Sequence, residues 1–116
     1  MVTRGDVFWT DLRPRSGAEQ SGRRPAVVVS HDAMNRVEEW QSMLMVPLST
    51  SARQAARGRT AILVPRGAAG LTRESVALCH QVTTVDRSKL MKRIGTLPAE
   101  VLRQIDTGLR HAMALE

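Results

Sequence analysis

A charged loop that runs directly into an apolar segment is the part of this chain best suited to chemistry. Residues 17–24 contain Glu19 and the pair Arg23 and Arg24, and they lead into the apolar run 26–29. An arginine at the mouth of a buried strand presents a rigid fork of N–H donors that can hold a phosphate bidentately. The loop therefore indicates an anion site, and a solvated turn is the alternative.

A second polar cluster follows another apolar run. Residues 43–48 predict a strand, so the hydroxyl groups of Ser49 and Thr50 would lie at a strand terminus. Pro47 cannot donate a ladder hydrogen bond, which suggests an edge strand or a strand end. The next segment, residues 52–59, is predicted to be a mobile basic loop without a large apolar residue; it carries Arg53, Arg57 and Arg59.

Composition narrows the range of partners and cofactors. The chain has 17 basic and 11 acidic residues and a formal charge of +6 at pH 7, which favours polyanions, above all nucleic acid. Aromatic residues make up only 3% of the sequence, so contacts with phosphate should outweigh base stacking. The lone Cys79 has an apolar setting typical of a core residue. The three histidines share no metal-ligand spacing, and neither a metal nor another cofactor is expected.

The elements that must position these groups are mainly short strands. They are predicted over residues 6–12, 25–30, 43–48, 60–64, 75–82 and around 93–95, and Ser30 is expected to cap a helical turn over 31–36. From Pro98 onward the apolar spacing changes to the helical period. This order indicates a small barrel or a strongly curled antiparallel sheet with a terminal helix packed on it.

The length of the chain sets its organisation. Its 116 residues allow one domain, residues 1–116. No apolar stretch approaches the roughly 18 residues of a membrane span, and the N-terminal residues lack an apolar signal core. We therefore expect a cytoplasmic protein.

Five short motifs keep a fixed order along nearly the whole chain. They are Arg4-Gly5-Asp6-Val7; Gly17-Ala18-Glu19-Gln20 with Arg24-Pro25-Ala26-Val27-Val28; Val46-Pro47-Leu48-Ser49-Thr50; Arg73-Glu74-Ser75-Val76; and His80-Gln81-Val82 with Val85-Asp86. Together they resemble the MazF/PemK endoribonuclease toxins of bacterial toxin–antitoxin pairs. The resemblance implies an SH3-like barrel of the MazF/CcdB kind, usually a homodimer, that cuts single-stranded RNA without a metal.

In the chemistry that this resemblance implies, the RNA supplies its own nucleophile. When a 2′-hydroxyl attacks the neighbouring phosphorus, the protein has to stabilise charge and transfer protons. Arg24 matches the family's catalytic arginine and would stabilise the pentacovalent phosphorane. Ser49 stands where relatives more often carry threonine, and its hydroxyl would donate a hydrogen bond to a non-bridging oxygen. Thr50 could do the same, and the alternative is that both hydroxyls merely cap a strand end.

The resemblance leaves the general base open. Arginine is almost never neutral near pH 7, so Arg24 suits the roles of stabiliser and acid better than that of base. Glu19 matches an acidic loop position and could accept the 2′-proton if the loop closes over RNA, or it could pair with Arg23 or Arg24. His80 is a candidate acid or base. Gln81 matches a residue near the family's groove and could read a base edge or satisfy backbone groups.

Other residues are expected to follow the RNA backbone. Several weak phosphate contacts add affinity without sequence information, and a solvated surface is the alternative for each residue. The expected RNA-binding set is Gln20, Arg23, Thr50, Arg53, Arg57, Arg59, His80 and Gln81.

The sequence thus predicts an endoribonuclease toxin that cuts mRNA to leave a 2′,3′-cyclic phosphate and a 5′-hydroxyl, and so inhibits translation and growth. Its expected antitoxin carries an acidic, disordered tail that competes with RNA for the basic groove. One alternative is a CcdB-like gyrase poison, which binds protein through its terminal helix, and another is an RNA-binding barrel without catalysis. The pair of Arg24 and Ser49, which could bind a phosphate, favours the nuclease, because a gyrase poison does not need a phosphate-binding pair.

Overall fold

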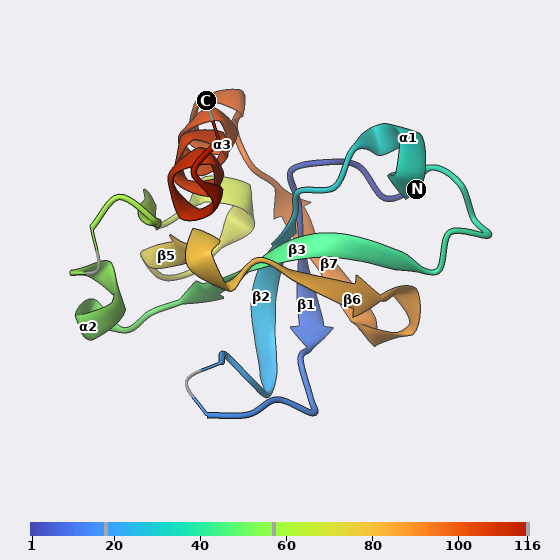
Figure 1. The fold of residues 1–116 in the computed structure, drawn as a ribbon, viewed down its shortest axis with the longest axis horizontal. Helices are drawn as coiled ribbons and strands as arrows, with labels where there is room; N and C mark the ends of the chain where they lie inside the picture. Colours follow the sequence, from blue (N-terminus) through green and yellow to red (C-terminus); the bar gives the residue numbers. More distant parts are fainter. Residues whose placement is uncertain (18, 57, 116) are drawn as a thin grey trace.

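In the computed structural model, which describes residues 1–17, 19–56 and 58–115, one antiparallel sheet winds around the core and a long helix lies across one end (Figure 1). The strand order is β4-β5-β3-β2-β1-β7, and β6 also pairs with β3. The strands are β1 (Asp6–Asp11), β2 (Arg23–Val28), β3 (Ser42–Ser49), β4 (Ala61–Val64), β5 (Ser75–Leu78), β6 (Thr83–Asp86) and β7 (Leu90–Thr96). The predicted mainly β fold with a C-terminal helix is confirmed.

The helical elements are short except for the last one. They are α1 (Asp32–Asn35), α2 (Ala52–Ala55), α3 (Ala99–Met113) and the 3₁₀ turns η1 (Ala68–Gly70), η2 (Cys79–Gln81) and η3 (Arg87–Lys89). α2 lies within the segment that the sequence predicted to be a loop.

Helix α3 packs closely on η2. At their contact, a Cβ atom on Gly108 would lie 2.7 Å from the Sγ atom of Cys79, so the absence of a side chain allows the approach. Burial raises the pKa of the Cys79 thiol to about 12. Cys79 is thus an unreactive core residue, as its setting predicted.

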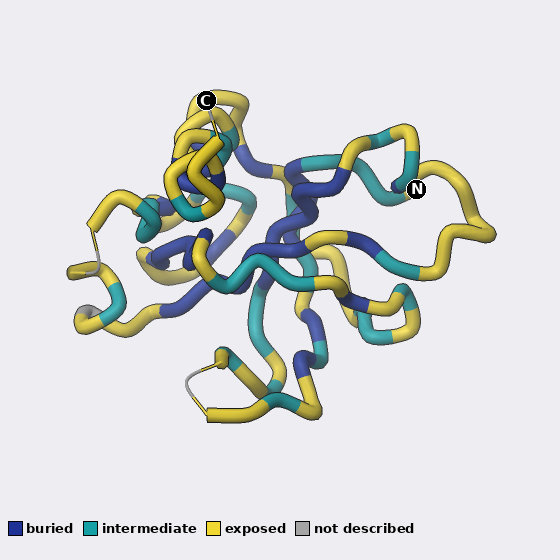
Figure 2. Tube along the Cα trace, viewed as in Figure 1, coloured by how far each residue is buried: buried dark blue, intermediate teal, exposed yellow. Residues whose placement is uncertain are grey.

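Both faces of the central sheet are buried, which explains the continuous apolar run of β2. Val27 and Val29 belong to the core cluster under α3, whereas Ala26 and Val28 belong to a second cluster on the opposite face. β3 follows the same rule, because successive side chains of a strand point to opposite faces. Figure 2 shows the buried residues concentrated on the strands that cross in the middle, and an exposed loop between β1 and β2.

Pro47 lies in a central strand, so the expected edge or end position is wrong. The carbonyl of Leu44 accepts a hydrogen bond from Val29 on the β2 side, so residues 43, 45 and 47 direct their backbone groups to the other side. On that side β3 pairs with β6 up to Met45 and with β5 from Leu48. The missing N–H of Pro47 falls in the gap between these two ladders.

Several boundaries also differ from the sequence prediction. The strand predicted over residues 75–82 is divided into β5 and the 3₁₀ turn η2, and β6 was not predicted as a strand. β2 begins at Arg23, two residues earlier than expected, because Arg23 and Arg24 pair with the end of β1. The Nδ1 atom of His31, rather than a group of Ser30, caps α1 by accepting from the backbone of Ala33. Pro98 is the N-cap of α3 and not its first residue.

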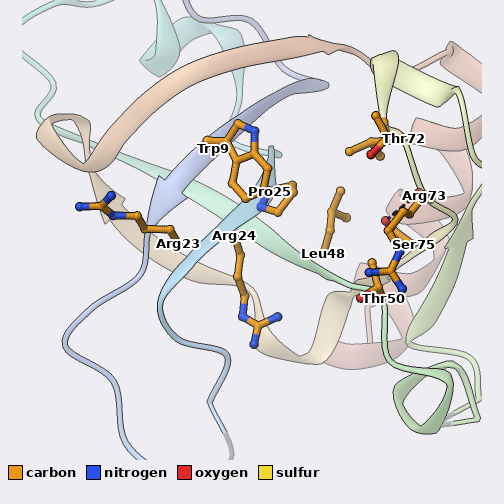
Figure 3. Close-up of a pocket in the computed structure, with 10 residues that line it drawn as sticks. Trp9, Arg23, Arg24, Pro25, Leu48, Thr50, Thr72, Arg73 and Ser75 are labelled. Atoms are coloured by element: carbon orange, nitrogen blue, oxygen red, sulfur yellow. Dashed lines mark hydrogen bonds between the residues drawn. The ribbon is translucent and has the colours of Figure 1, made fainter.

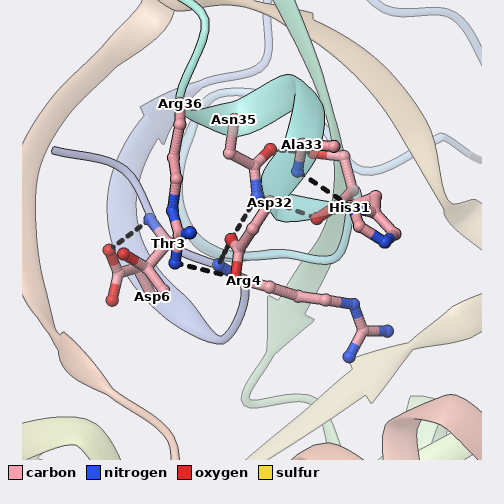
Figure 4. Close-up of polar contacts among 9 residues, drawn as sticks. Thr3, Arg4, Asp6, His31, Asp32, Ala33, Asn35 and Arg36 are labelled. Carbon is pink, nitrogen blue, oxygen red and sulfur yellow. Dashed lines mark hydrogen bonds and ion pairs between the residues drawn. The ribbon is translucent and has the colours of Figure 1, made fainter.

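A polar network holds the N-terminal segment against α1 and α3 (Figure 4). The Asp32 carboxylate accepts hydrogen bonds from the backbone N of Arg4 at 2.7 Å and from Asn35 at 3.1 Å. These bonds keep the pKa of Asp32 below its ordinary value. The guanidinium of Arg4 pairs with Asp106 of α3. The network thereby anchors the start of β1, at the end remote from Arg23 and Arg24.

The sheet is completed along one seam by a 3₁₀ turn. Within the described residues the edge strands β4 and β7 do not pair with each other, and η1 packs against β7 at the seam. A Cβ atom on Gly95 of β7 would lie only 2.4 Å from the carbonyl oxygen of Ala69 in η1. The curled sheet is therefore a barrel left open on one side.

We expect Gly95→Ala to lower the free energy of unfolding by about 1–3 kcal/mol, the usual cost of overpacking. The added methyl group meets backbone and not the end of a flexible side chain, so η1 as a whole would have to shift. Urea denaturation measures the effect, with Lys92→Ala on the exposed face of the same strand as control. Equal midpoints for the two variants would contradict the close approach of η1.

Candidate active site

A pocket of about 260 Å³ opens beside the β1–β2 pair, across from the segment between η1 and β5 (Figure 3). Its apolar residues come from four elements or loops, and its charged and hydroxyl-bearing residues are contributed by β2, the end of β3 and residues 72–75. The lining consists of Trp9, Arg23, Arg24, Pro25, Leu48, Thr50, Leu71, Thr72, Arg73 and Ser75.

Arg24 is positioned by the strand pair and by the preceding loop. It lies opposite Thr10 of β1 and is half-buried. Its Nε atom donates a hydrogen bond to the carbonyl of Ser21 at 2.7 Å, and in Figure 3 the guanidinium extends away from Trp9 at the outer edge of the pocket. This hydrogen bond uses only Nε, so the N–H groups of the two terminal nitrogens remain to donate to an anion.

Asp11 of β1 lies opposite Arg23 in the strand register but is paired with Arg13. Asp11 accepts two hydrogen bonds from the Arg13 guanidinium, each 2.9 Å long. Together with a backbone hydrogen bond from Arg13, they hold the pKa of Asp11 well below its ordinary value. Asp11 therefore stays ionised and engaged with Arg13 at neutral pH. Arg23, its partner in the strand register, is exposed and extends away from the other lining residues.

The two candidate hydroxyl residues occupy different environments. Thr50 is exposed and lines the pocket. Ser49 is only 5% exposed, pairs with Val76 of β5, and accepts a hydrogen bond from the backbone N of Ser51 at 3.1 Å. That bond orients the Ser49 hydroxyl without using its proton. Thr50 thus lines the pocket, whereas Ser49 does not, although its sequence neighbours Leu48 and Thr50 both do.

Alanine variants at the two positions separate their roles. For the RNA cleavage that the family resemblance implies, we expect Ser49→Ala to lower the rate about tenfold, the effect of losing one hydrogen bond of about 1.5 kcal/mol to a charged oxygen. Thr50→Ala is the matched comparison, and single-turnover rates on one RNA measure both. A loss of rate in Thr50→Ala alone would assign the hydroxyl role to Thr50.

The loop between β1 and β2 holds Glu19 away from the arginines of β2. Its carboxylate lies 3.4 Å from the Nη2 atom of Arg15 and accepts from the backbone N of Ser16 at 2.9 Å. The predicted pairing of Glu19 with Arg23 or Arg24 is therefore replaced by a pairing with Arg15. In this arrangement Glu19 is not poised to accept a proton at the pocket.

The same loop lies against η2 and β6. Arg15 donates to the hydroxyl of Thr83 in β6 at 3.1 Å, and the backbone N of Gln20 donates to the side-chain oxygen of Gln81 in η2 at 2.6 Å. Gln20 and Gln81 thus hold the loop in place in this structure.

The other expected RNA-binding residues do not line the pocket. Arg53 lies in α2 and Arg59 in the turn before β4, and both are exposed. His80 is exposed in η2. Arg57 lies outside the described residues. The structure therefore brings Arg23, Arg24 and Thr50 into one pocket, whereas Arg53, Arg59 and His80 are not among its lining residues.

Sequence reasoning did not assign a role to two prominent lining residues. Trp9 falls within the strand predicted over residues 6–12, and 43% of its surface is exposed. Arg73 was noted only as part of a motif, and it stands across the pocket from Arg24 (Figure 3). The local sequence contains no signal for Trp9, because residues 6–12 do not alternate strictly between polar and apolar types and single exposed apolar side chains are common on protein surfaces.

The described part of the chain holds neither a metal-binding cluster nor a membrane-spanning helix. No cluster of three or more His, Cys, Asp or Glu side chains there could hold a metal ion. None of the helices in these residues is long and apolar enough to cross a membrane.

Comparison with known proteins identifies the family of this chain. A family model described as PemK-like, MazF-like toxin of type II toxin-antitoxin system matches residues 3–113. Endoribonuclease EndoA of Bacillus subtilis (strain 168) is 34% identical over 115 residues, which are 99% of this chain and 97% of that protein.

Solved structures give the same result. The crystal structure of MazF from Deinococcus radiodurans superimposes with a TM-score of 0.79 at 28% identity and covers 97% of this chain and 96% of its own. A structure of MazE-MazF from the same organism reaches a TM-score of 0.73 at 27% identity, with 97% and 96% coverage. The chain belongs to the PemK-like and MazF-like toxins of type II toxin–antitoxin systems.

Proposed function

We propose that this chain, as one domain spanning residues 1–116, is a metal-independent endoribonuclease that cleaves single-stranded mRNA at specific sequences in the cytoplasm. The proposal rests on the pocket that is lined by both the Arg24 guanidinium and the Thr50 hydroxyl. A relative that is 34% identical to this chain is named an endoribonuclease. A gyrase poison has no need of such a phosphate-binding pair.

In the proposed reaction the 2′-oxygen of a ribose attacks the adjacent phosphorus while its proton passes to a base. The 5′-oxygen of the next nucleotide leaves and takes up a proton, which gives a 2′,3′-cyclic phosphate and a 5′-hydroxyl. The terminal nitrogens of Arg24 donate to the non-bridging oxygens, whose charge grows in the transition state. The hydroxyl of Ser49 or Thr50 supplies a further donor.

Glu19 can act as the base only after a rearrangement. It would have to leave Arg15 and the backbone of Ser16, and the loop would have to move over the bound RNA. Substrate-induced loop closure of this kind is common in enzymes.

The proposed partners follow from the family and from the charge. We propose that the protein forms a homodimer, as the family resemblance implies, and that it is restrained by an antitoxin, since a Deinococcus relative has been solved as MazE-MazF. The net charge of +6 favours an antitoxin with an acidic, disordered tail. Such a tail would compete with RNA for Arg24 and for the exposed arginines near the pocket.

Incubation of the purified protein with a long transcript in EDTA tests the proposed activity. We expect cleavage at discrete sites with cyclic phosphate and 5′-hydroxyl ends, because no step uses a metal. Primer extension locates the sites and thereby the recognised sequence. An intact transcript would favour the gyrase-poisoning or purely RNA-binding alternatives, and cleavage that needs added Mg²⁺ would contradict the mechanism.

A further inference from the structure

Trp9 is a large side chain that neither core cluster uses. It lies opposite Pro25 in the β1–β2 register and exposes 43% of its surface. Figure 3 shows its ring beside Pro25, with Leu48 between this pair and Ser75. An indole fixed on a strand pair offers a rigid aromatic face at a low cost in conformational entropy.

Arg73 provides a second cation on the far side of the same pocket (Figure 3). No residue in the described ranges forms a hydrogen bond or ion pair with its exposed guanidinium. Its backbone is held, because the hydroxyl of Ser75 donates to the Arg73 carbonyl at 3.2 Å. The pocket thus has an apolar floor and a cationic residue on each of two sides.

The size of the pocket limits what can enter it. About 260 Å³ is below the roughly 300–1,000 Å³ of sites for drug-sized ligands. A single planar group fits this volume better than a run of stacked bases. One nucleobase of a single strand has flat apolar faces and a phosphate on each side, which matches an apolar floor between Arg24 and Arg73.

We propose that the pocket takes one unstacked nucleobase next to the scissile phosphate, with the indole of Trp9 as its stacking surface and Arg73 as the contact for the phosphate on the other side of that base. The inference rests on the proposed endoribonuclease activity. It makes Trp9 and Arg73 determinants of substrate binding, with Arg24 left to act on the reacting phosphate.

The chain allows a direct optical test, because it contains two tryptophans and no tyrosine. In a Trp40→Phe protein, Trp9 is the only indole; Trp40 lies outside this pocket. The probe is a ten-nucleotide RNA around a mapped cleavage site, with one 2′-deoxyribose 5′ of the scissile phosphate so that it is not cut. We expect the probe to quench Trp9 fluorescence on binding.

Abasic substitution identifies the base that stacks. Removing the base next to the scissile phosphate should weaken binding about 5- to 150-fold, the range for one base stacked on an aromatic side chain. The same removal should have little effect on a Trp9→Ala variant, because the coupling is lost with the ring. Circular dichroism verifies the fold, and Trp9→Phe should restore part of the affinity.

Salt dependence tests Arg73. We expect Arg73→Ala to reduce the slope of log affinity against log salt by about 0.7, the value for one lost phosphate contact on a single strand. Arg103→Ala on the exposed face of α3 removes the same charge away from the pocket and should leave the slope unchanged.

The outcomes separate this inference from the proposed function. A Trp40→Phe protein that cuts RNA, shows no change in Trp9 fluorescence and binds abasic and intact probes equally would overturn the stacking site alone. Equal salt slopes for Arg73→Ala and Arg103→Ala would overturn the phosphate contact. If both the wild type and a folded Trp40→Phe protein fail to cut RNA, the proposed activity and the site that rests on it are both wrong.

Discussion

Replacing Arg24 by alanine is expected to lower the rate of RNA cleavage by a factor of about 10² to 10³, as removal of one donor to a developing oxyanion typically does. The guanidinium is held by one bond from Nε to Ser21 and projects from the edge of the pocket, so the side chain serves the site more than the core. Single-turnover rates at saturating protein separate this effect from weaker binding.

Two further variants define what the arginine contributes. Arg24→Lys retains a charge but loses the planar fork, and we expect it to recover only part of the rate. Arg103→Ala removes a charge from α3 and should cleave like the wild type. Circular dichroism of all three variants establishes the fold, and wild-type cleavage by a folded Arg24→Ala protein would show that the reactive centre lies elsewhere.

A single deoxyribose should abolish cleavage at one phosphate. If the 2′-hydroxyl attacks, replacing the ribose immediately 5′ of the scissile phosphate removes the nucleophile itself, so no product is expected there. Binding should change little, because most of the affinity is expected from phosphate contacts. Gel analysis of a labelled oligonucleotide measures cleavage, and filter binding measures affinity.

The position of the substitution is the control. A deoxyribose placed one nucleotide further 3′ leaves the attacking oxygen in place, and that RNA should still be cut at the same phosphate. Cleavage of the first oligonucleotide at the original phosphate would mean that water, and not the ribose, is the nucleophile. Arg24 could then still be essential, but transesterification would be wrong.

Local patterns in the sequence were enough to predict most of the fold. The β-rich run over residues 6–12, the apolar run of β2 and the helical period after Pro98 each depend on neighbouring residues, and each element is present. Pro47 was misread because its tolerance depends on where β3 changes partners from β6 to β5. That change involves residues about 30 positions away, which no local pattern encodes.

In the candidate site, too, local sequence patterns predict some positions, and contacts between distant residues determine the rest. Arg24 and Thr50 could be selected because Arg24 lies at the start of β2 and Thr50 follows the end of β3. In an antiparallel pair the start of one strand lies beside the end of its neighbour. The pairing of Glu19 with Arg15 could not be predicted, because it depends on how the loop rests on Thr83 and Gln81. The position of Arg73 across from Arg24 likewise depends on how far the sheet curls, which involves contacts between distant segments such as that of η1 with Gly95.

Strand β3 pairs with β2, β5 and β6, contributes to both core clusters, and ends at the two candidate hydroxyl residues. Its amide protons should therefore exchange with solvent only through global opening, in contrast to those of the loop between β1 and β2. Heat or denaturant would then remove catalysis and tertiary structure in one cooperative transition. A destabilised molecule would keep full turnover in its folded fraction, and the toxic dose would follow the population of native protein.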